Sequence, residues 1–276
     1  MEREQEHHKE VKKVCFFSYF RKKRFTRRHR GNEVEPSPKT TGTRYYKPSE
    51  KKISDEVDLR NMMSEVRDQR NINSCFAFAG AGILEALMKK KTGFKHVVSP
   101  AFNYYWTRKI EGTYPGNVGA YMSNYMKSLK ENGFVLEKSM PFLNRADQEP
   151  SIALNALGLM TKFYLKYTKK VSVKPEDYLD CLNKEQPLFV GMRINTEWFD
   201  VRSDGIIDSK TPNIGGHAII IAGRILFDAD YYAIIKNSWG RSYGDKGYCY
   251  VPWEYVEKYS FEAYTIDYNN LKDNPM

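Results

Sequence analysis

The spacing of apolar residues changes from a helical to a strand period about halfway along the chain, and this change restricts the possible folds most. In the first half, residues 76–91 carry apolar side chains at helical spacing, with Ser74 as the expected N-cap and Gly93 beyond the end. Two more helices are predicted over residues 120–131 and 174–183. The second half holds β-branched and aromatic runs of strand length, at residues 187–194, 217–222, 231–235 and 247–251. Helices followed by strands predict an α+β fold of two substructures packed together.

The composition excludes several classes of protein. Apolar residues make up 41% of the 276 residues, which is enough for a sizeable core and excludes a wholly disordered chain. Four cysteines are too few for a disulfide-dense scaffold. The longest nearly uncharged apolar stretch, residues 75–88, is interrupted by Gly80, Gly82 and Glu85 and is too short to span a membrane. We therefore expect no transmembrane helix.

Most of the excess positive charge lies in the first 50 residues. The whole chain has a formal net charge of +10, from 44 Lys and Arg against 34 Asp and Glu. Residues 1–50 hold 14 of the basic and 7 of the acidic residues, a net +7, so residues 51–276 carry only +3. The densest part, Arg21–Arg30, has seven Lys or Arg among ten residues and no carboxylate. Blocks of like charge resist folding, and residues 31–50 have the composition of a linker. Residues 1–50 are thus predicted to be a disordered tail, ahead of a folded region at 51–276.

The basic block admits several interpretations that the sequence leaves open. Beside the aromatic cluster Cys15–Phe20 it fits an anionic membrane surface, and by itself it fits nucleic acid or a nuclear import receptor. A solvated tail with no partner is the plainest alternative. The cluster is too short for a secretory signal, and most of its basic neighbours follow it, so none is predicted. His7 and His8 stand alone, and no paired ligand spacing is present, so neither a metal nor a cofactor is expected.

Three short segments carry residues with catalytic chemistry. They are Gln69–Ala79 (QRNINSCFAFA), Gly215–Ala218 (GGHA) and Lys236–Gly240 (KNSWG). Cys75 stands where a loop enters the predicted helix, and the positive end of a helix dipole stabilises a thiolate, the reactive form of cysteine. His217 can stabilise that thiolate as an imidazolium and later donate a proton. The two residues therefore form a candidate pair for nucleophilic catalysis.

The remaining polar residues of these segments can support the pair. Asn237 can orient the histidine through its amide oxygen, and Trp239 can shield that hydrogen bond from water. Gln69 can aim its amide N–H at a developing oxyanion, together with the backbone N–H of Cys75. Each residue has a plainer interpretation, since a lone cysteine is usually a small buried hydrophobe and His217 can be an ordinary strand residue. Their joint occurrence is what favours an enzyme.

Taken together, the three segments resemble the signature of the papain family of cysteine peptidases. Cys75 is 142 residues before His217 and 162 before Asn237, close to the family's spacing of about 130–150 residues. The resemblance runs from about residue 57 to residue 259. It includes Ser99–Trp106, which is similar to the helix that follows the family's nucleophile helix, and the glycines after the third segment. It is most similar to the bacterial, archaeal and viral branch.

The resemblance implies a papain-like two-lobe α+β fold. A mainly helical lobe at about 57–165 would carry the nucleophile helix, and a mainly antiparallel β lobe at about 166–276 would carry the histidine and asparagine, with the substrate cleft between them. The implied roles are nucleophile, acid/base, orienting residue and oxyanion donor, for Cys75, His217, Asn237 and Gln69 in that order. Asn73 and Gly216, which neighbour these groups in the sequence, are candidates for substrate contacts.

The chain departs from the family pattern around the nucleophile. Ile72 stands where the family often has a disulfide cysteine, and Asn73 and Arg70 stand where glycine is usual. Phe76 takes the place of the usual tryptophan. Asn73 is expected to keep the turn, since asparagine tolerates left-handed backbone angles. The other cysteines are scattered, so no disulfide framework is implied, which favours an intracellular, reducing compartment.

The implied activity is that of a cysteine endopeptidase, which hydrolyses peptide bonds of a protein or peptide substrate through an acyl-enzyme on Cys75. Two other classes stay open: an acyl transferase, since an amine can capture the acyl-enzyme, and an inactive peptide-binding homologue whose cleft Arg70 and Asn73 block. A monomer is assumed. Residues 1–50 are short for the family's inhibitory propeptide, so the tail is predicted to target or dock the protein.

Overall fold

The computed structural model describes residues 43–49, 54–151, 161–207, 215–267 and 271, so the basic block at residues 21–30 lies outside the described residues. Its helices are α2 (Cys75–Thr92), α3 (Pro100–Ile110), α4 (Met122–Glu131), α6 (Pro175–Asn183) and α7 (Trp253–Tyr259), with short 3-10 turns η1 (Arg60–Met62) and η2 (Thr196–Phe199). Its strands are β1 (Thr43–Tyr45), β2 (Val57–Asp58), β3 (Thr168–Val171), β4 (Leu188–Ile194), β5 (Gly215–Phe227), β6 (Asp230–Lys236), β7 (Tyr248–Pro252) and β8 (Ser260–Thr265). The three helices and four strands predicted from the apolar period are therefore confirmed within a few residues. Among these described residues, no helix has both the length and the apolar character needed to cross a membrane.

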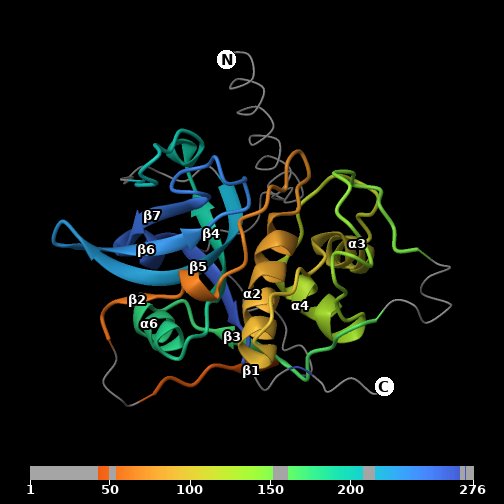
Figure 1. Ribbon diagram of the computed structural model, residues 1–276, viewed down its shortest axis with the longest axis horizontal. Helices are drawn as coiled ribbons and strands as arrows, with labels where there is room; N and C mark the ends of the chain where they lie inside the picture. The colour runs from red at the N-terminus through yellow and green to blue at the C-terminus, as the bar shows by residue number, and fades with distance from the viewer. Residues whose placement is uncertain (1–42, 50–53, 152–160, 208–214, 268–270, 272–276) are drawn as a thin grey trace, which may run out of the picture.

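The molecule has a helical half and a sheet half, which lie side by side in Figure 1. Helices α2, α3 and α4 form one half, and a twisted sheet with strand order β1-β3-β8-β4-β5-β6-β7 forms the other. β2 pairs with β5, and of the described pairs only β1–β3 is parallel. Helix α2 lies between the two halves, so its first residue is placed at their junction.

Helix α2 is buried on all sides over most of its length because it is enclosed by both halves. Every residue from Phe76 to Met88 is buried, which is the pattern of a central helix. Gly80 faces Tyr125 of α4, and Gly82 faces Ile220 of β5, so closely that a Cβ at either glycine would overlap the neighbouring side chain. The helix ends at Gly93, which adopts the left-handed conformation (φ 75°) and donates its N–H to Lys89 O. Ser74 occupies the N-cap position, as predicted, but its side chain makes no capping hydrogen bond.

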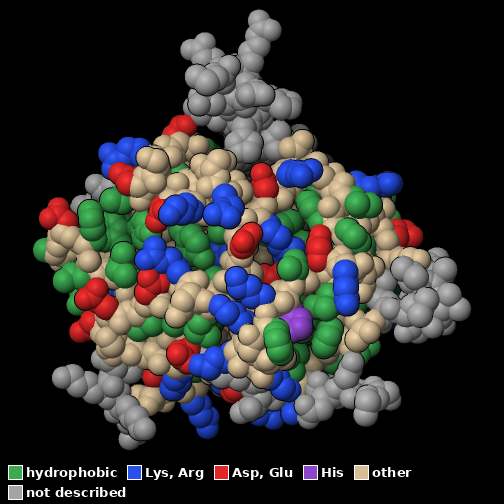
Figure 2. Space-filling view, in the orientation of Figure 1, with side chains coloured by type: hydrophobic (Ala, Val, Ile, Leu, Met, Phe, Trp, Pro, Cys, Tyr) green, Lys and Arg blue, Asp and Glu red, His purple; other side chains and the backbone are tan. Residues whose placement is uncertain are grey.

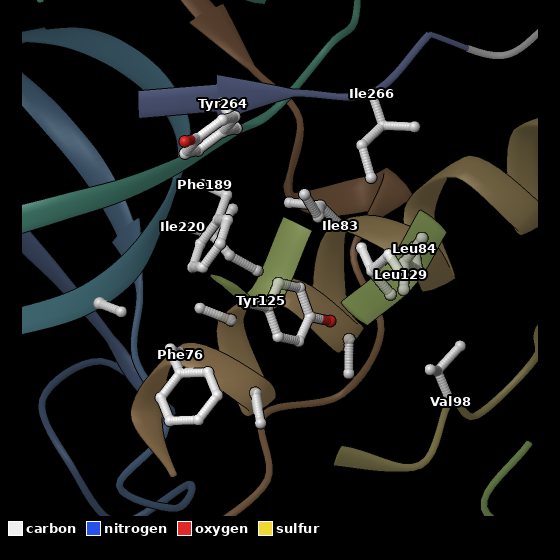
Figure 3. Packing of buried hydrophobic residues seen from close by; sticks show 14 of the residues in the cluster. Phe76, Ile83, Leu84, Val98, Tyr125, Leu129, Phe189, Ile220, Tyr264 and Ile266 are labelled. Atoms are coloured by element: carbon white, nitrogen blue, oxygen red, sulfur yellow. The ribbon is translucent and has the colours of Figure 1, made fainter. Parts of the chain in front are cut away.

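One hydrophobic core joins the two halves. Figure 3 shows Phe76, Ile83 and Tyr125 from the helices facing Phe189, Ile220 and Tyr264 from the sheet. The ring centroids of Tyr125 and Phe189 are 5.5 Å apart, and those of Phe76 and Tyr125 are 5.9 Å apart. Edge-to-face contacts between buried rings favour one relative placement. The shared core therefore holds the start of α2 at a definite position against β5.

The packed part of the chain begins earlier than the boundary at residue 50 that the composition suggested. β1 pairs with β3 in register Thr43 to Thr168, and Tyr46 is 7% exposed. The Tyr46 hydroxyl donates to Asp180 Oδ2 at 2.5 Å, and the Lys184 ammonium donates to the Tyr46 oxygen at 2.8 Å. A single aromatic anchor of this kind leaves no periodic signal, which is why the linker-like composition concealed it.

Candidate active site

Cys75, the first residue of α2, meets His217 of β5 in a small cavity between the two halves. The cavity has a volume of about 20 Å³ and is lined from the helical side by Cys75 and Met122, and from the sheet side by Gly216, His217 and Phe261. Cys75 is partly exposed and is not in a disulfide. The structure thus brings together the first and second motifs, with Gly216 beside them.

The other two described cysteines differ from Cys75 in burial. Cys181 and Cys249 are fully buried and are not in disulfides. Burial raises the pKa of each thiol to about 12. Neither can supply a thiolate near neutral pH, so Cys75 is the one described cysteine placed for nucleophilic chemistry.

The imidazole of His217 is oriented by the third motif. Its Nε2 lies 2.8 Å from Asn237 Oδ1, and the same oxygen accepts the backbone N–H of Ser238 at 2.8 Å. Because an amide oxygen only accepts hydrogen bonds, Nε2 must carry the hydrogen and donate it. This tautomer leaves Nδ1 as the ring nitrogen that can exchange a proton with Cys75.

Aromatic side chains cover the pair formed by His217 and Asn237. Trp239 stacks on the imidazole with ring centroids 4.7 Å apart and an interplanar angle of 28°. Phe199 also stacks on Trp239, with ring centroids 5.5 Å apart, and Tyr243 makes an edge contact with Trp239 at 5.1 Å. Water is therefore kept from the His217–Asn237 hydrogen bond, which is stronger in such surroundings. The sequence indicated Trp239 for this role, whereas Phe199 and Tyr243 carried no signal.

Gln69 is fixed to the residue that follows Asn237. Its backbone N–H donates to Ser238 O at 2.9 Å, and its Oε1 accepts the Ser238 hydroxyl at 2.7 Å. Its Nε2 donates one N–H to Ile72 O at 2.9 Å, and an amide nitrogen carries two. The side chain is 1% exposed, so it is held rigidly. One segment thus positions both the orienting asparagine and the candidate oxyanion donor.

The loop before Cys75 differs from the expectation in two respects. The left-handed backbone angle falls on Arg70 (φ 51°), and Asn73 is not among the described residues with positive φ. Asn73 is fully buried, with its side-chain amide donating to Asn117 O at 2.8 Å and its backbone N–H donating to Asn117 Oδ1 at 2.9 Å. A side chain used in this way cannot face a substrate. Asn73 therefore supports the loop through its side chain, and a contact with substrate, which its backbone could make, stays a prediction.

A buried ionic network, which the motifs did not indicate, lies behind Asn237. The preceding residue, Lys236, donates from Nζ to Ser64 Oγ at 2.8 Å, and the Ser64 hydroxyl donates to the Glu85 carboxylate. Arg67 pairs with Glu85 at 2.8 Å and with Glu137 at 3.3 Å. Burial lowers the pKa of the Lys236 ammonium to about 8. The network links α2 to the end of β6, and therefore links the helix of the nucleophile to the strand that leads to Asn237.

The structure defines a class of protein: two lobes, one helical and one a sheet, with a cysteine thiol and a histidine imidazole that share a cavity at the junction and an asparagine beside the histidine. Residues 53–266 match the family model for papain family cysteine proteases, so the chain belongs to the papain family. It is 28% identical over 226 residues to cathepsin K of Mus musculus, which covers 79% of this chain and 66% of that relative. It is 27% identical over 218 residues to cathepsin S of Mus musculus, with 77% and 62% covered. The chain thus spans about two-thirds or less of the length of these curated relatives.

Solved structures show the same fold. Xylellain, a cysteine protease from Xylella fastidiosa, superposes with a TM-score of 0.72 at 24% identity, over 81% of this chain and 91% of that one. Digestive procathepsin L 3 of Tenebrio molitor larval midgut superposes with a TM-score of 0.68 at 21% identity, over 82% and 75%. The expected two-lobe α+β fold is thereby confirmed. With relatives from a mammal and a neighbour from a bacterium, the narrower assignment to the bacterial, archaeal and viral branch stays a prediction.

Proposed function

We propose that this chain is a cysteine endopeptidase with Cys75 as nucleophile and His217 as acid and base. The observation that carries the proposal is the hydrogen bond from His217 Nε2 to Asn237 Oδ1, which is 2.8 Å long and is covered by Trp239. His217 lines the same cavity as Cys75. A histidine that only fills a strand has no need of an orienting amide and an aromatic cover. A proton-transfer residue needs both a defined tautomer and a defined orientation.

The reaction would proceed in two halves. His217 takes the thiol proton, and the Cys75 sulfur attacks the peptide carbonyl carbon. The oxyanion accepts hydrogen bonds from the Cys75 backbone N–H and from the side-chain amide of Gln69. The C–N bond then breaks, and the His217 imidazolium protonates the leaving amine. In the second half His217 takes a proton from water, the resulting hydroxide attacks the acyl carbon, and the Cys75 thiolate leaves and is reprotonated.

The lining of the cavity supports an apolar substrate side chain near the scissile bond. Ala120, Met122 and Phe261 face the space beside the pair, so the surroundings of the scissile bond are apolar on this side. Gly216 presents no side chain there, so its backbone is available to hydrogen-bond with an extended peptide. We retain Gly216 as a substrate-contact residue and assign the specificity mainly to Met122 and Phe261.

The nucleophile can be tested with an electrophilic epoxide probe and a peptide library. Cys75→Ala is expected to abolish both labelling and hydrolysis, because no other described cysteine has an accessible thiol. Cys181→Ala is the matched control, since burial raises the pKa of its thiol to about 12 and removes it from the chemistry. Labelling that persisted in Cys75→Ala would show that the nucleophile is another residue. Amide products without hydrolysis, seen by mass spectrometry, would favour an acyl transferase.

We also propose an intracellular, reducing compartment for the protein. The support is that the three described cysteines are unpaired as disulfides and that Ile72 stands where relatives often have a disulfide cysteine. The basic block at residues 21–30 is proposed as a targeting or docking arm for an anionic partner, because its charge is not needed for the chemistry of the cleft. The purified protein's partner preference can be measured by comparing anionic vesicles, nucleic acid and an import receptor.

A further inference from the structure

A second cavity, larger than the one at Cys75, lies elsewhere on the molecule. It has a volume of about 220 Å³, and none of its lining residues lines the cavity that holds Cys75 and His217. Its walls come from the end of η1 and the segment after it, from the last turns of α2 and from the segment at residues 95–97. We call it the Met62 cavity. A cavity of about 150 Å³ can hold a benzene molecule, so this one has room for one ring with a short acidic chain.

The walls of the Met62 cavity combine an apolar interior with a cationic edge. Met62, Met63 and Val97 supply the apolar part. Lys89 and Lys95 supply the charge, and among the described residues neither forms an ion pair with a carboxylate. Lys89 donates to the backbone carbonyl of Asn61 at the edge, so its ammonium is held there. Thioether side chains adapt to ligands of different shape.

The balance of charge around the cavity favours an anion. Two of the lining residues carry carboxylates, Glu65 and Glu85. Glu85 already pairs with Arg67 at 2.8 Å and accepts the backbone N–H of Val98 at 2.9 Å. The other, Glu65, points to solvent with a side-chain exposure of 80% and lies 4.0 Å from Arg241. The positive charges of Lys89 and Lys95 are thus not balanced by a carboxylate of the cavity wall. Figure 2 shows the corresponding face, where Lys and Arg side chains gather beside hydrophobic ones over α2.

The cavity shares its inner wall with the buried ionic network. Ser64, Arg67 and Glu85 line it, and each is a member of that network. Ser64 Oγ accepts from Lys236, the residue before Asn237. An acidic group between Lys89 and Lys95 would add negative charge beside Glu85 and Arg67, and would so alter the contacts that place the end of β6 against α2. Contacts from the cavity wall thus reach Lys236, the residue before Asn237.

We propose that the Met62 cavity is an effector site for a small amphipathic anion, with one apolar ring or short alkyl chain and one carboxylate or similar acidic group. The ring would lie against Met62 and Met63, and the acidic group would lie between Lys89 and Lys95. The proposal that the cavity binds such an anion does not depend on catalytic activity. The proposal that the bound anion changes the activity rests on the proposed peptidase function.

Binding can be tested by ligand-observed NMR on the full chain, with 3-phenylpropionate as the probe and 3-phenylpropionamide as its uncharged match. The acid is expected to bind, and the double variant Lys89→Gln/Lys95→Gln is expected to weaken its affinity about tenfold, as is the change from acid to amide. Lys91→Gln, on an exposed residue of the same helix outside the cavity, should leave the affinity unchanged. No binding of the acid, or equal affinity for wild type and the double variant, would overturn the site. Both lysines lie at the surface, and thermal unfolding would confirm that the variants are folded.

The effector role has a separate readout. Saturating 3-phenylpropionate is expected to lower kcat/KM for peptide cleavage in the wild type and to have no effect in the double variant. An unchanged kcat/KM with the probe bound would overturn the effector role. A wild type that cleaves no peptide would instead overturn the proposed function, and the binding measurement would still decide whether the site exists.

Discussion

The dependence of stability on pH should reveal the buried ammonium of Lys236. This side chain is 6% exposed, donates to Ser64 Oγ at 2.8 Å, and has its pKa lowered by burial to about 8. A lysine in the unfolded chain has a pKa of about 10.4. Between these two values the folded state binds fewer protons than the unfolded state. The free energy of unfolding therefore rises with pH across this window, and below about pH 8 the buried charge is a constant cost.

The substitution Lys236→Met isolates this contribution, because methionine fills a similar space without titrating. Linkage between the two pKa values makes the wild type gain about 2 to 3 kcal/mol in free energy of unfolding, relative to the variant, between pH 7 and pH 10. Groups that titrate alike in both proteins, including the buried tyrosines, cancel in this difference.

Urea unfolding followed by tryptophan fluorescence at pH 7, 8, 9 and 10 measures the difference. Lys91→Met, which removes an exposed lysine of α2, is the matched control, and its difference from the wild type should stay flat. A flat difference for Lys236→Met as well would show that Lys236 titrates as it does in water. That result would refute the inference that its charge is buried at the junction of the two halves.

Three further predictions concern the site and its surroundings. Trp239→Ala should lower kcat/KM for peptide cleavage about fivefold to tenfold, since the hydrogen bond that it covers would weaken by about 1 kcal/mol; an unchanged rate would exclude the shielding role. Removal of residues 1–42, ahead of β1, should leave cleavage of a small peptide unchanged, and a large rise in rate would identify the tail as an inhibitor. Cys181 and Cys249 should resist iodoacetamide near neutral pH, since burial raises both pKa values to about 12. Mass spectrometry of the native protein would show whether either is alkylated.

Several elements were predictable from the sequence because their signals are local. Helix α2 has apolar residues at helical spacing and a glycine just past its end, and β4 to β7 are runs of β-branched and aromatic residues. The segment from Trp253 to Thr265 escaped prediction, because charged residues alternate irregularly with aromatic ones there. It forms α7 and then β8, which pairs with β3 and β4 in the middle of the sheet. Its strand character is decided by those neighbours.

The candidate site, too, has residues that local sequence predicts and contacts that only the folded structure shows. Cys75, His217, Asn237, Gln69 and Trp239 could be predicted as site residues from the sequence, because each belongs to a short segment whose residue types and order suggest this chemistry. The surroundings of the Asn73 side chain, by contrast, could not be foreseen from the sequence. Its partner, Asn117, is 44 residues away, and only the packing of that loop shows that the Asn73 side chain is already used.

By itself, then, the sequence determined the helical and strand halves, the candidate reacting residues and the confinement of most excess charge to the tail, since all of these are properties of neighbouring residues. Only the tertiary structure decided the tautomer of His217, the network around Lys236, the Tyr46 anchor and the Met62 cavity. Each of these depends on groups that are not neighbours in the chain, such as Ser64 and Lys236, 172 residues apart. Such groups meet only in the folded chain, where burial strengthens the hydrogen bonds and charge interactions between them.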